Sequence, residues 1–150
     1  MAAAIAPLLI ALASFVLRLV NLGATKGYIF DEVYYVDGAR DLLKYGVEVS
    51  GSNPEFIVHP PVGKWLIAAG IAIFGDNEFG WRFATALVGT LLILVFARLI
   101  HVLFYSPVLT GLGAALMALD GLLLVHSRTA LLDLFLTFFV LVGVLLWHRD

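Results

Sequence analysis

The chain has 150 residues, of which 62% are hydrophobic and 13% are charged, whereas an ordinary globular domain has about 45–50% apolar and about 25% charged residues. The formal net charge is −2 and there is no cysteine. The charge gives no basic excess for nucleic acid, and the lack of cysteine excludes disulfides and thiolate chemistry. The composition predicts an all-α membrane protein whose function depends on its few charged residues.

Four apolar runs have the length of membrane-spanning helices, for which a hydrocarbon core of about 30 Å requires about 20 residues. A cleaved signal peptide is the competing interpretation of the first run, but the run lacks a basic start and a clear cleavage signature. The second run is bracketed by Arg82 and Arg98, so it spans only if both side chains snorkel to the interfaces. We predict spans at about 3–20, 82–101, 107–125 and 129–147.

A polar loop at about 21–81 separates the first two spans and carries most of the charge. Within it, Asp31 to Tyr45 has the apolar spacing of an amphipathic surface helix, with Gly46 as its stop. The apolar stretch from Trp65 to Phe74 is too short to span and predicts an interfacial or re-entrant helix. The segment 47–58 between them is expected to be irregular.

The alternation of four spans brings the loop and the turn at Arg128 to one side of the membrane. Arg98 and His101 then lie on the other side, with both termini. The bases of the long loop give no clear result under the positive-inside rule, because the loop is at the length limit of that rule. Charge counting therefore leaves the orientation open.

Two adjacent carboxylates, Asp31 and Glu32, follow the first span. One interpretation is structural, because Asp31 is a good helix N-cap and Glu32 suits the positive end of the helix dipole. The other is catalytic: a carboxylate at the membrane interface acts as a general base toward a hydroxyl, and its neighbour tunes the pKa by like-charge repulsion. The two interpretations are compatible.

A second candidate cluster contains His59 and Lys64, on either side of a helix start after Pro60 and Pro61. A lysine in the first turn of a helix opposes the helix dipole, so its position points to an anionic partner such as a phosphate. The alternative is that Lys64 snorkels to lipid headgroups.

Two arginines, Arg82 and Arg128, lie at the loop-side ends of predicted spans, where snorkelling is the usual explanation. Inside the membrane, Asp120 and Asp133 are functional candidates by default, and we expect Asp133 to pair with Arg128. Four scattered histidines without paired spacing make no metal motif, so we assign no metal ligand; the metal requirement stays unknown.

The motifs in this order resemble the protein O-mannosyltransferases. The matching segments are "DEVYY" from Asp31, "VHPPVGKWL" from Val58, "FGWRF" from Phe79 and "ALDGLLLVHSRTALLDLF" from Ala118. The compact first loop is most similar to the actinobacterial branch. Members of the family are several times longer, so residues 1–150 resemble the N-terminal part of a single transmembrane transferase domain, one that could be inactive alone.

This resemblance implies a glycosyltransferase C-type multi-span fold in the bacterial plasma membrane, with the first long loop and the active site on the extracytoplasmic face. It implies inverting transfer of mannose from polyprenyl-phosphate-mannose to Ser or Thr of secreted proteins. Asp31 would be the catalytic base with Glu32 in support. Donor phosphate or sugar would be met by His59, Lys64, Arg82 and Arg128. No cofactor is implied beyond this lipid-linked donor.

Two other functions stay open. A related lipid-phosphate-sugar transferase of the aminoarabinose type would have a similar fold but a glycolipid acceptor. A transporter or non-catalytic membrane subunit would use intramembrane charges such as Asp120 and Asp133 along a solute path. Against the latter, most charges cluster in the loop rather than at a broken helix pair in the middle of the bilayer.

Overall fold

The computed structural model describes residues 2–51, 53–54 and 58–148. These residues form helices joined by short turns and one two-stranded antiparallel hairpin in the long loop. The elements are α1 (Ala2–Leu19), α2 (Glu32–Tyr45), β1 (Val49–Ser50), β2 (Asn53–Pro54), α3 (Val62–Phe74), α4 (Glu78–Phe104), α5 (Pro107–Leu119), α6 (Gly121–His126) and α7 (Asp133–Trp147).

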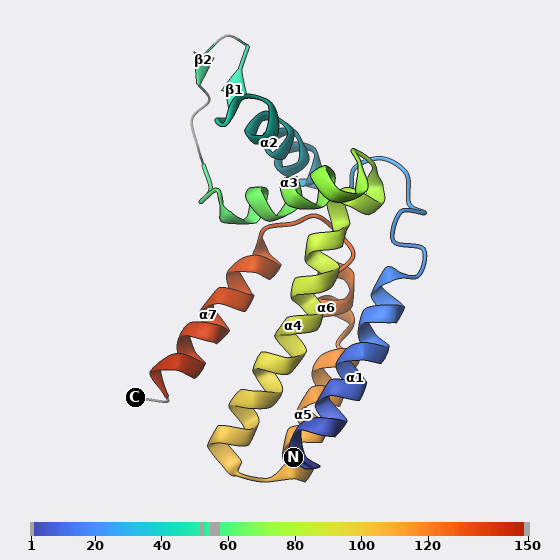
Figure 1. The fold of residues 1–150 in the computed structure, drawn as a ribbon, viewed down its shortest axis with the longest axis vertical. Helices are drawn as coiled ribbons and strands as arrows, with labels where there is room; N and C mark the ends of the chain where they lie inside the picture. The colour runs from blue at the N-terminus through green and yellow to red at the C-terminus, as the bar shows by residue number, and fades with distance from the viewer. Residues whose placement is uncertain (1, 52, 55–57, 149–150) are drawn as a thin grey trace.

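The long helices run side by side along the main axis of the molecule, and the loop elements are gathered at one end (Figure 1). Helix α4 is central, because it packs against α1, α3, α5 and α7. Helix α3 crosses the end of this bundle, and α2 packs on α3. The α4–α5 turn lies at the opposite end, close to the start of α1 (Figure 1). The arrangement places the candidate residues of the long loop at one end of the bundle.

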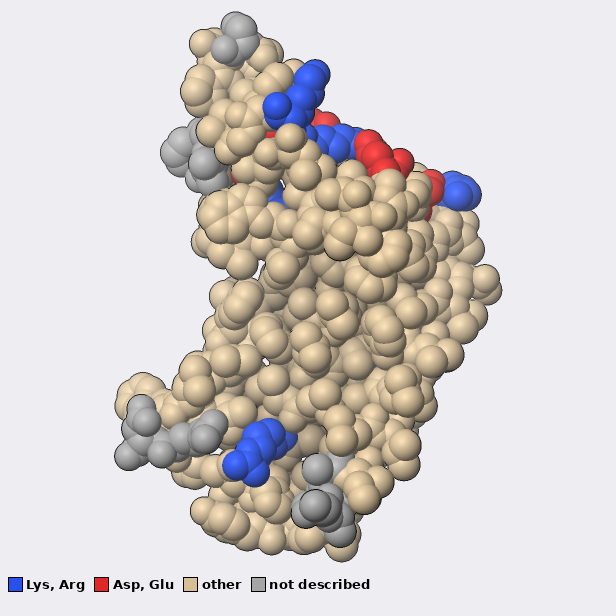
Figure 2. All heavy atoms as spheres, viewed as in Figure 1, with Lys and Arg blue, Asp and Glu red and all other residues tan. Residues whose placement is uncertain are grey.

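Helix α4 alone, among the helices of the described residues, is long and apolar enough to cross a membrane by length and composition. Four shorter apolar helices accompany it, over Ile5–Leu19, Val62–Phe74, Pro107–Leu119 and Asp133–Trp147. Most charged residues in this view gather around α2, α3 and the adjoining loops, whereas the long helices show uncharged atoms except for one basic group near their far end (Figure 2). The long apolar helix and this separation of charge are those of a membrane protein.

The amphipathic helix predicted at 31–45 is confirmed as α2, which has Asp31 at the N-cap and Gly46 in the left-handed conformation at its end (φ 75°). The short apolar helix predicted at 65–74 is confirmed as α3, which begins three residues earlier. Helix α4 extends beyond its predicted bounds, because the Asn77 side chain caps its start by accepting from Phe79 N and Gly80 N at 3.1 Å each.

Two predicted helices have different bounds. The run predicted at 107–125 is interrupted at Asp120, whose extended backbone ends α5 and whose Oδ1 accepts from Leu123 N at 2.6 Å to start α6. The run predicted at 129–147 becomes helical only at Asp133. The segment expected to be irregular contains the β1–β2 hairpin, which turns through Gly51 (φ 65°). The Asp120 cap explains the break between α5 and α6, and the left-handed Gly51 explains the hairpin turn.

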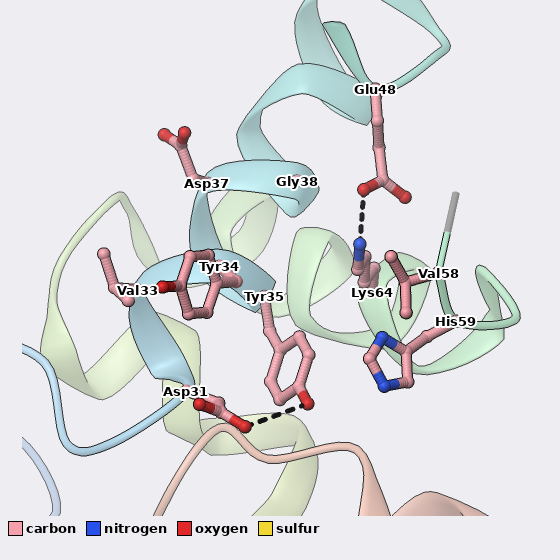
Figure 3. Close-up of a pocket in the computed structure, with 10 residues that line it drawn as sticks. All are labelled: Asp31, Val33, Tyr34, Tyr35, Asp37, Gly38, Glu48, Val58, His59 and Lys64. Carbon is pink, nitrogen blue, oxygen red and sulfur yellow. Dashed lines mark hydrogen bonds and ion pairs between the residues drawn. The ribbon is translucent and has the colours of Figure 1, made fainter. Parts of the chain in front are cut away.

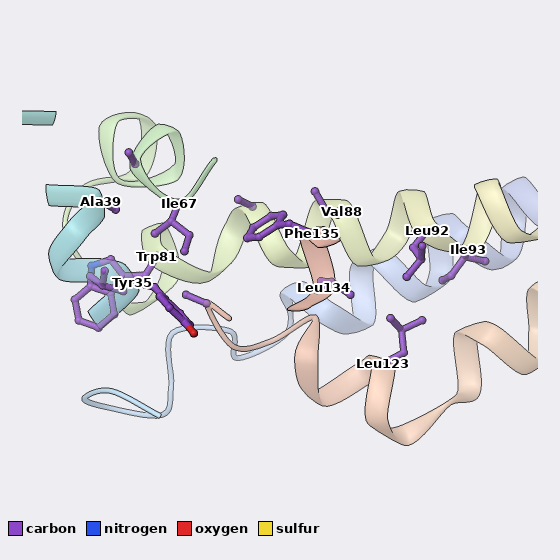
Figure 4. Packing of buried hydrophobic residues seen from close by; sticks show 14 of the residues in the cluster. Tyr35, Ala39, Ile67, Trp81, Val88, Leu92, Ile93, Leu123, Leu134 and Phe135 are labelled. Atoms are coloured by element: carbon purple, nitrogen blue, oxygen red, sulfur yellow. The ribbon is translucent and has the colours of Figure 1, made fainter. Parts of the chain in front are cut away.

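One hydrophobic core joins the loop helices to the bundle (Figure 4). Val36 and Ala39 of α2 and Ile67 of α3 are fully buried in it, continuous with residues of α4 and α7 such as Leu92 and Phe135. Because this packing is continuous, α2 and α3 hold fixed positions over the end of the bundle.

An ion pair on the surface, the Arg40–Asp76 latch, fastens α2 to the turn before α4. Arg40 Nε and Nη2 donate to Asp76 at 2.8 and 3.0 Å, and the guanidinium lies 5.8 Å from the ring centre of Tyr28 and 5.3 Å from that of Trp81. Trp81 Nε1 also donates to Asp76, at 2.6 Å. Hydrogen bonding from Arg40 is the main reason that the pKa of Asp76 lies below its usual value.

Candidate active site

A cavity of about 470 Å³ opens beside the start of α2 (Figure 3). Its wall brings together three of the residues predicted from the sequence, Asp31, His59 and Lys64. The complete lining is Asp31, Val33, Tyr34, Tyr35, Asp37, Gly38, Glu48, Val58, His59 and Lys64. We call this space the Asp31 cavity. The other three predicted residues lie outside its wall.

Asp31 is at the N-cap position of α2, but its side chain makes no capping hydrogen bond. The carboxylate is half-buried, and its Oδ2 accepts a hydrogen bond from Tyr35 Oη at 3.4 Å. The backbone carbonyl of Asp31, not its side chain, accepts from the first turn of the helix, from Tyr34 N and Tyr35 N at 3.1 and 3.2 Å. The Asp31 carboxylate is therefore available to a ligand in the cavity.

Tyr35 is the side chain that orients Asp31. Burial, followed by the charges of Asp31 and Asp133, raises the pKa of the Tyr35 phenol, so the hydroxyl keeps its proton and donates. The ring also packs edge-on against His59, with 5.5 Å between ring centres (Figure 3). Tyr35 and His59 line a second, mostly apolar cavity of about 330 Å³ between the starts of α3 and α7, to which Asp133 contributes. The two cavities thus share a wall.

Glu32 has different surroundings from its neighbour. Its carboxylate forms a bidentate ion pair with Arg82, with 2.8 Å from Nε to Oε1 and 2.8 Å from Nη2 to Oε2. The side chains are 0% and 1% exposed. Glu32 also accepts from two backbone N–H groups, those of Ile29 at 2.8 Å and Ala130 at 2.7 Å. One carboxylate therefore joins the polar loop, α4 and the segment before α7.

Arg82 uses its remaining N–H groups on backbone carbonyls of the segment after α1. Its acceptors there are Leu22 O at 3.4 Å, Thr25 O at 2.8 Å and Gly27 O at 2.9 Å. A guanidinium has five N–H donors, and each has an acceptor here. We call Glu32, Arg82 and these backbone groups the Glu32–Arg82 hub. Arg82 does not snorkel to a headgroup, and no donor is left over for a phosphate.

Lys64 forms a second buried ion pair, with Glu48. The two side chains are 7% and 5% exposed, so the interpretation that Lys64 snorkels to lipid is wrong. Its anionic partner is a carboxylate of the chain itself. Sequence reasoning missed Glu48, because a single glutamate in a segment without periodicity gives no pattern. Glu48 Oε1 has no hydrogen-bond partner although it is buried.

Arg128 lies near the end of α1, where its Nη1 donates to Leu17 O at 3.0 Å and to Arg18 O at 2.8 Å. The expected pair with Asp133 is wrong, since Arg128 is bound to these helix-end carbonyls and the described residues show no contact between the two charges. A cation at the last carbonyls of a helix is favoured by its dipole. Arg128 also lines a cavity of about 310 Å³ together with Arg82.

Arg18 is a further buried charge that the sequence did not single out. The side chain is 0% exposed and donates through Nη1 to the carbonyl and hydroxyl of Ser14. Its Nε and Nη2 have no hydrogen-bond partner. The only sequence signal was one arginine inside an apolar run. Within the described part of the chain, no group of three or more His, Asp or Glu residues could hold a metal ion.

The fold and the site define a class: an α-helical membrane protein with an acidic cavity at the loop end of its bundle. Comparison with known proteins gives the family. The profile of the family described as dolichyl-phosphate-mannose-protein mannosyltransferase matches residues 58–150. The chain belongs to this family of membrane-embedded proteins, as the motifs predicted. No solved structure matches the chain.

Relatives named polyprenol-phosphate-mannose–protein mannosyltransferase support this assignment. The one from Mycobacterium tuberculosis is 45% identical over 95% of this chain and 28% of its own length. That from Mycolicibacterium smegmatis is 41% identical over 81% of this chain and 24% of its length. A Pseudomonas aeruginosa protein is named undecaprenyl phosphate-alpha-4-amino-4-deoxy-L-arabinose arabinosyl transferase. It is 36% identical over 81% of this chain and 23% of its own length. The chain therefore spans less than a third of these relatives.

Proposed function

We propose that the gene product containing these residues transfers mannose from polyprenyl-phosphate-mannose to Ser or Thr hydroxyls of secreted proteins, with inversion at the anomeric carbon. The names of the relatives that are 41–45% identical support the donor and the protein acceptor. The activity is that of the full-length protein, because the chain covers only part of its relatives.

One observation carries the catalytic assignment: the Asp31 carboxylate lies in the cavity wall without a capping hydrogen bond. We assign Asp31 as the general base. It removes the proton of the acceptor hydroxyl as the oxygen bonds to the anomeric carbon, while the bond from that carbon to the phosphate oxygen breaks. The electron pair leaves with the polyprenyl phosphate. A single displacement of this kind inverts the anomeric centre and needs no covalent enzyme intermediate.

The remaining predicted residues receive roles from their contacts. Glu32 positions Asp31, because the Glu32 carboxylate fixes the backbone at the start of α2. The charge of Glu32 itself is compensated by Arg82. Arg82 acts with it, as a positioning residue. Arg128 is our candidate for the departing phosphate, because only its Nη1 donates to the described residues. His59 contacts the substrate from the wall shared by the two cavities.

The proposal includes a topology of four spans in the bacterial plasma membrane, with the loop on the extracytoplasmic face. Helices α1, α4 and α7 would be three of the spans, and α5 and α6 together would form one span interrupted at Asp120 (Figure 1). Large apolar side chains are exposed on these helices, including Leu12, Leu112 and Val140. Lipid, or other spanning helices, would cover such surfaces.

The replacement Asp31→Asn tests the assignment of the base. In membranes containing the full-length gene product, we expect transfer from labelled polyprenyl-phosphate-mannose to a Ser/Thr peptide to fall about 10²- to 10⁴-fold. Membrane insertion and protein amount should be unchanged. The control Glu78→Gln removes a carboxylate that pairs with the exposed Lys26 outside the cavity wall, and it should leave transfer unchanged. Turnover retained in Asp31→Asn would overturn the assignment.

The aminoarabinose alternative is favoured by one feature, the acidic lining of the Asp31 cavity, which would also suit an amino sugar. Offering mannose and aminoarabinose donors, each with a peptide and with a glycolipid acceptor, separates the two functions. We expect product from the mannose donor and the peptide. A transporter subunit would give no product in any combination.

A further inference from the structure

The Glu48–Lys64 pair is part of the cavity wall rather than of the protein interior. Glu48 lies before β1 and Lys64 in the first turn of α3, and both line the Asp31 cavity. Figure 3 shows Glu48 extending toward Lys64, with its second oxygen on the side of Val58 and His59. Among the residues that the structure describes, Glu48 is the hydrogen-bond partner of the Lys64 ammonium.

The backbone of α2 leaves room for this pair at Gly38. A Cβ atom at that position would lie 2.8 Å from Glu48 Oε2 and 3.1 Å from Lys64 Nζ. Real Cβ atoms essentially never show a contact as short as 2.8 Å, so a larger residue at this position would push the end of the Glu48 side chain aside and crowd that of Lys64. Three separate segments therefore place the two charges: α2, the residue before the hairpin and α3.

Hydrogen-bonding capacity in the pair is left unused. Glu48 Oε1 is a buried carboxylate oxygen without a donor. An ammonium has three N–H donors, and one of those of Lys64 is used by Glu48. A buried acceptor without a partner is unfavourable, because it has lost its hydrogen bonds to water and gained none in the protein. A bound group that both donates and accepts hydrogen bonds would remove this cost.

Charge decides which ligand fits. The cavity wall contains three carboxylates, Asp31, Asp37 and Glu48, against the single lysine. A phosphate would meet repulsion there, and its natural cation is already paired. A hydroxyl carries no charge, donates to a carboxylate and accepts from an ammonium. The wall therefore suits a neutral polyol better than an anion.

We infer that the Glu48–Lys64 pair is a binding site for adjacent hydroxyl groups of the transferred sugar, with Glu48 accepting from one hydroxyl and Lys64 donating to the next. The inference rests on the proposed function for the identity of the sugar. It assigns Lys64 to the sugar rather than to the phosphate. It also adds Glu48, the buried carboxylate opposite Lys64, to the site.

The test is equilibrium binding to the full-length protein in lipid nanodiscs, which requires no turnover. The two ligands are polyprenyl-phosphate-mannose and polyprenyl methyl phosphate, which has the same phosphodiester charge but no sugar. We expect the wild-type protein to prefer the mannosyl lipid about 10- to 100-fold, the range for hydrogen bonds to charged groups. In the neutral double variant Glu48→Gln, Lys64→Met the preference should fall to within about twofold, with binding of the methyl lipid unchanged.

The matched control is the double variant Glu78→Gln, Lys26→Met, which neutralises another carboxylate–lysine pair, one that lies outside the cavity wall and has an exposed lysine. It should keep the wild-type preference. The inference is overturned if the wild-type protein has no preference, if the Glu48–Lys64 variant retains it, or if that variant loses both ligands equally. Preference without any transfer to peptide would contradict the proposed function and leave the sugar site standing.

Discussion

The Glu32–Arg82 hub and the Asp31 cavity contain adjacent residues of the sequence, Glu32 and Asp31, but they differ in how completely their polar groups are hydrogen-bonded. In the hub each guanidinium N–H has an acceptor, and the side chains are 0% and 1% exposed. In the cavity Asp31 has one hydrogen bond of 3.4 Å, and Glu48 has an oxygen with none. Adjacent helical residues point about 100° apart, so neighbouring carboxylates can have separate functions.

The contrast also separates stability from reactivity. A buried ion pair with all of its hydrogen bonds made holds the structure together and has nothing left for a ligand. Unused donors and acceptors in a cavity reduce the stability of the folded protein, but a ligand that forms hydrogen bonds with them removes this loss. The predictions below test this division, from the largest expected effect to the smallest.

Removing one member of the hub should have the largest effect on stability. Arg82→Met leaves the Glu32 carboxylate buried without its cation, for which a loss of about 3–5 kcal/mol is expected. The full-length protein in detergent should show it in denaturant unfolding. The double variant Glu32→Gln, Arg82→Met should recover much of the loss, because no buried charge remains. Equal stability of Arg82→Met and wild type would mean that the hub is not structural.

Gly38→Ala should change ligand binding in the cavity without a large change in the stability of the fold. The new methyl group pushes on the flexible ends of Glu48 and Lys64, while alanine favours the helix by about 1 kcal/mol. We expect stability within about 1 kcal/mol of wild type and a preference for the mannosyl lipid reduced about tenfold, as for one lost hydrogen bond to a charged group. Gly121→Ala, where a Cβ meets no atom within 4 Å, is the control. Unaltered binding by Gly38→Ala would contradict the placement of the pair.

Tyr35→Phe tests how strongly the cavity orients Asp31, the proposed base. The lost hydrogen bond to Asp31 is long and involves a charged group, so we expect transfer to fall about threefold, near the lower end for one hydrogen bond. The measurement is kcat with the mannosyl lipid and a Ser/Thr peptide. Tyr45→Phe, at the exposed end of the same helix, should have no effect. A stability loss in Tyr35→Phe without a change in kcat would assign the hydroxyl to the fold.

The Arg40–Asp76 latch is an ion pair near water, and its contribution to stability should depend on pH. The pKa of Asp76 is lower in the folded protein than its unfolded value of about 4. Its stabilisation is therefore present above about pH 4 and is lost as the pH falls through the lower folded pKa. The Asp76 side chain is 47% exposed, so the effect should stay below about 1 kcal/mol.

The measurement for the latch is the midpoint of thermal unfolding between pH 3 and pH 7, for wild type and Asp76→Asn. The variant should lose less stability on acidification than wild type does. Asp37→Asn, whose carboxylate is 75% exposed and 3.9 Å from Arg40, is the matched control and should follow the wild-type curve. Parallel curves for wild type and Asp76→Asn would show that the latch has no measurable linkage to pH.

Much of the fold was predictable, because hydrophobic periodicity and stop residues mark helices directly. Helix α2 and its Gly46 stop follow from the pattern. The break at Asp120 did not, since one aspartate in an apolar run indicates a cap or an intramembrane charge equally well. The site was predictable as a set of residue types, with Asp31, His59 and Lys64 meeting in one cavity. The ion pairs of the site were not predictable, because Glu32–Arg82 and Glu48–Lys64 join residues that are 50 and 16 positions apart in the sequence.

The Glu32–Arg82 hub also sets an order of events during synthesis. Glu32 accepts from Arg82, 50 residues later, and from Ala130, 98 residues later. The carboxylate can therefore make these contacts only after α4 and the segment before α7 have been synthesised. The start of α2, and Asp31 with it, acquires its final position only after that. The loop that carries Asp31, although made early, is completed by the chain that follows it.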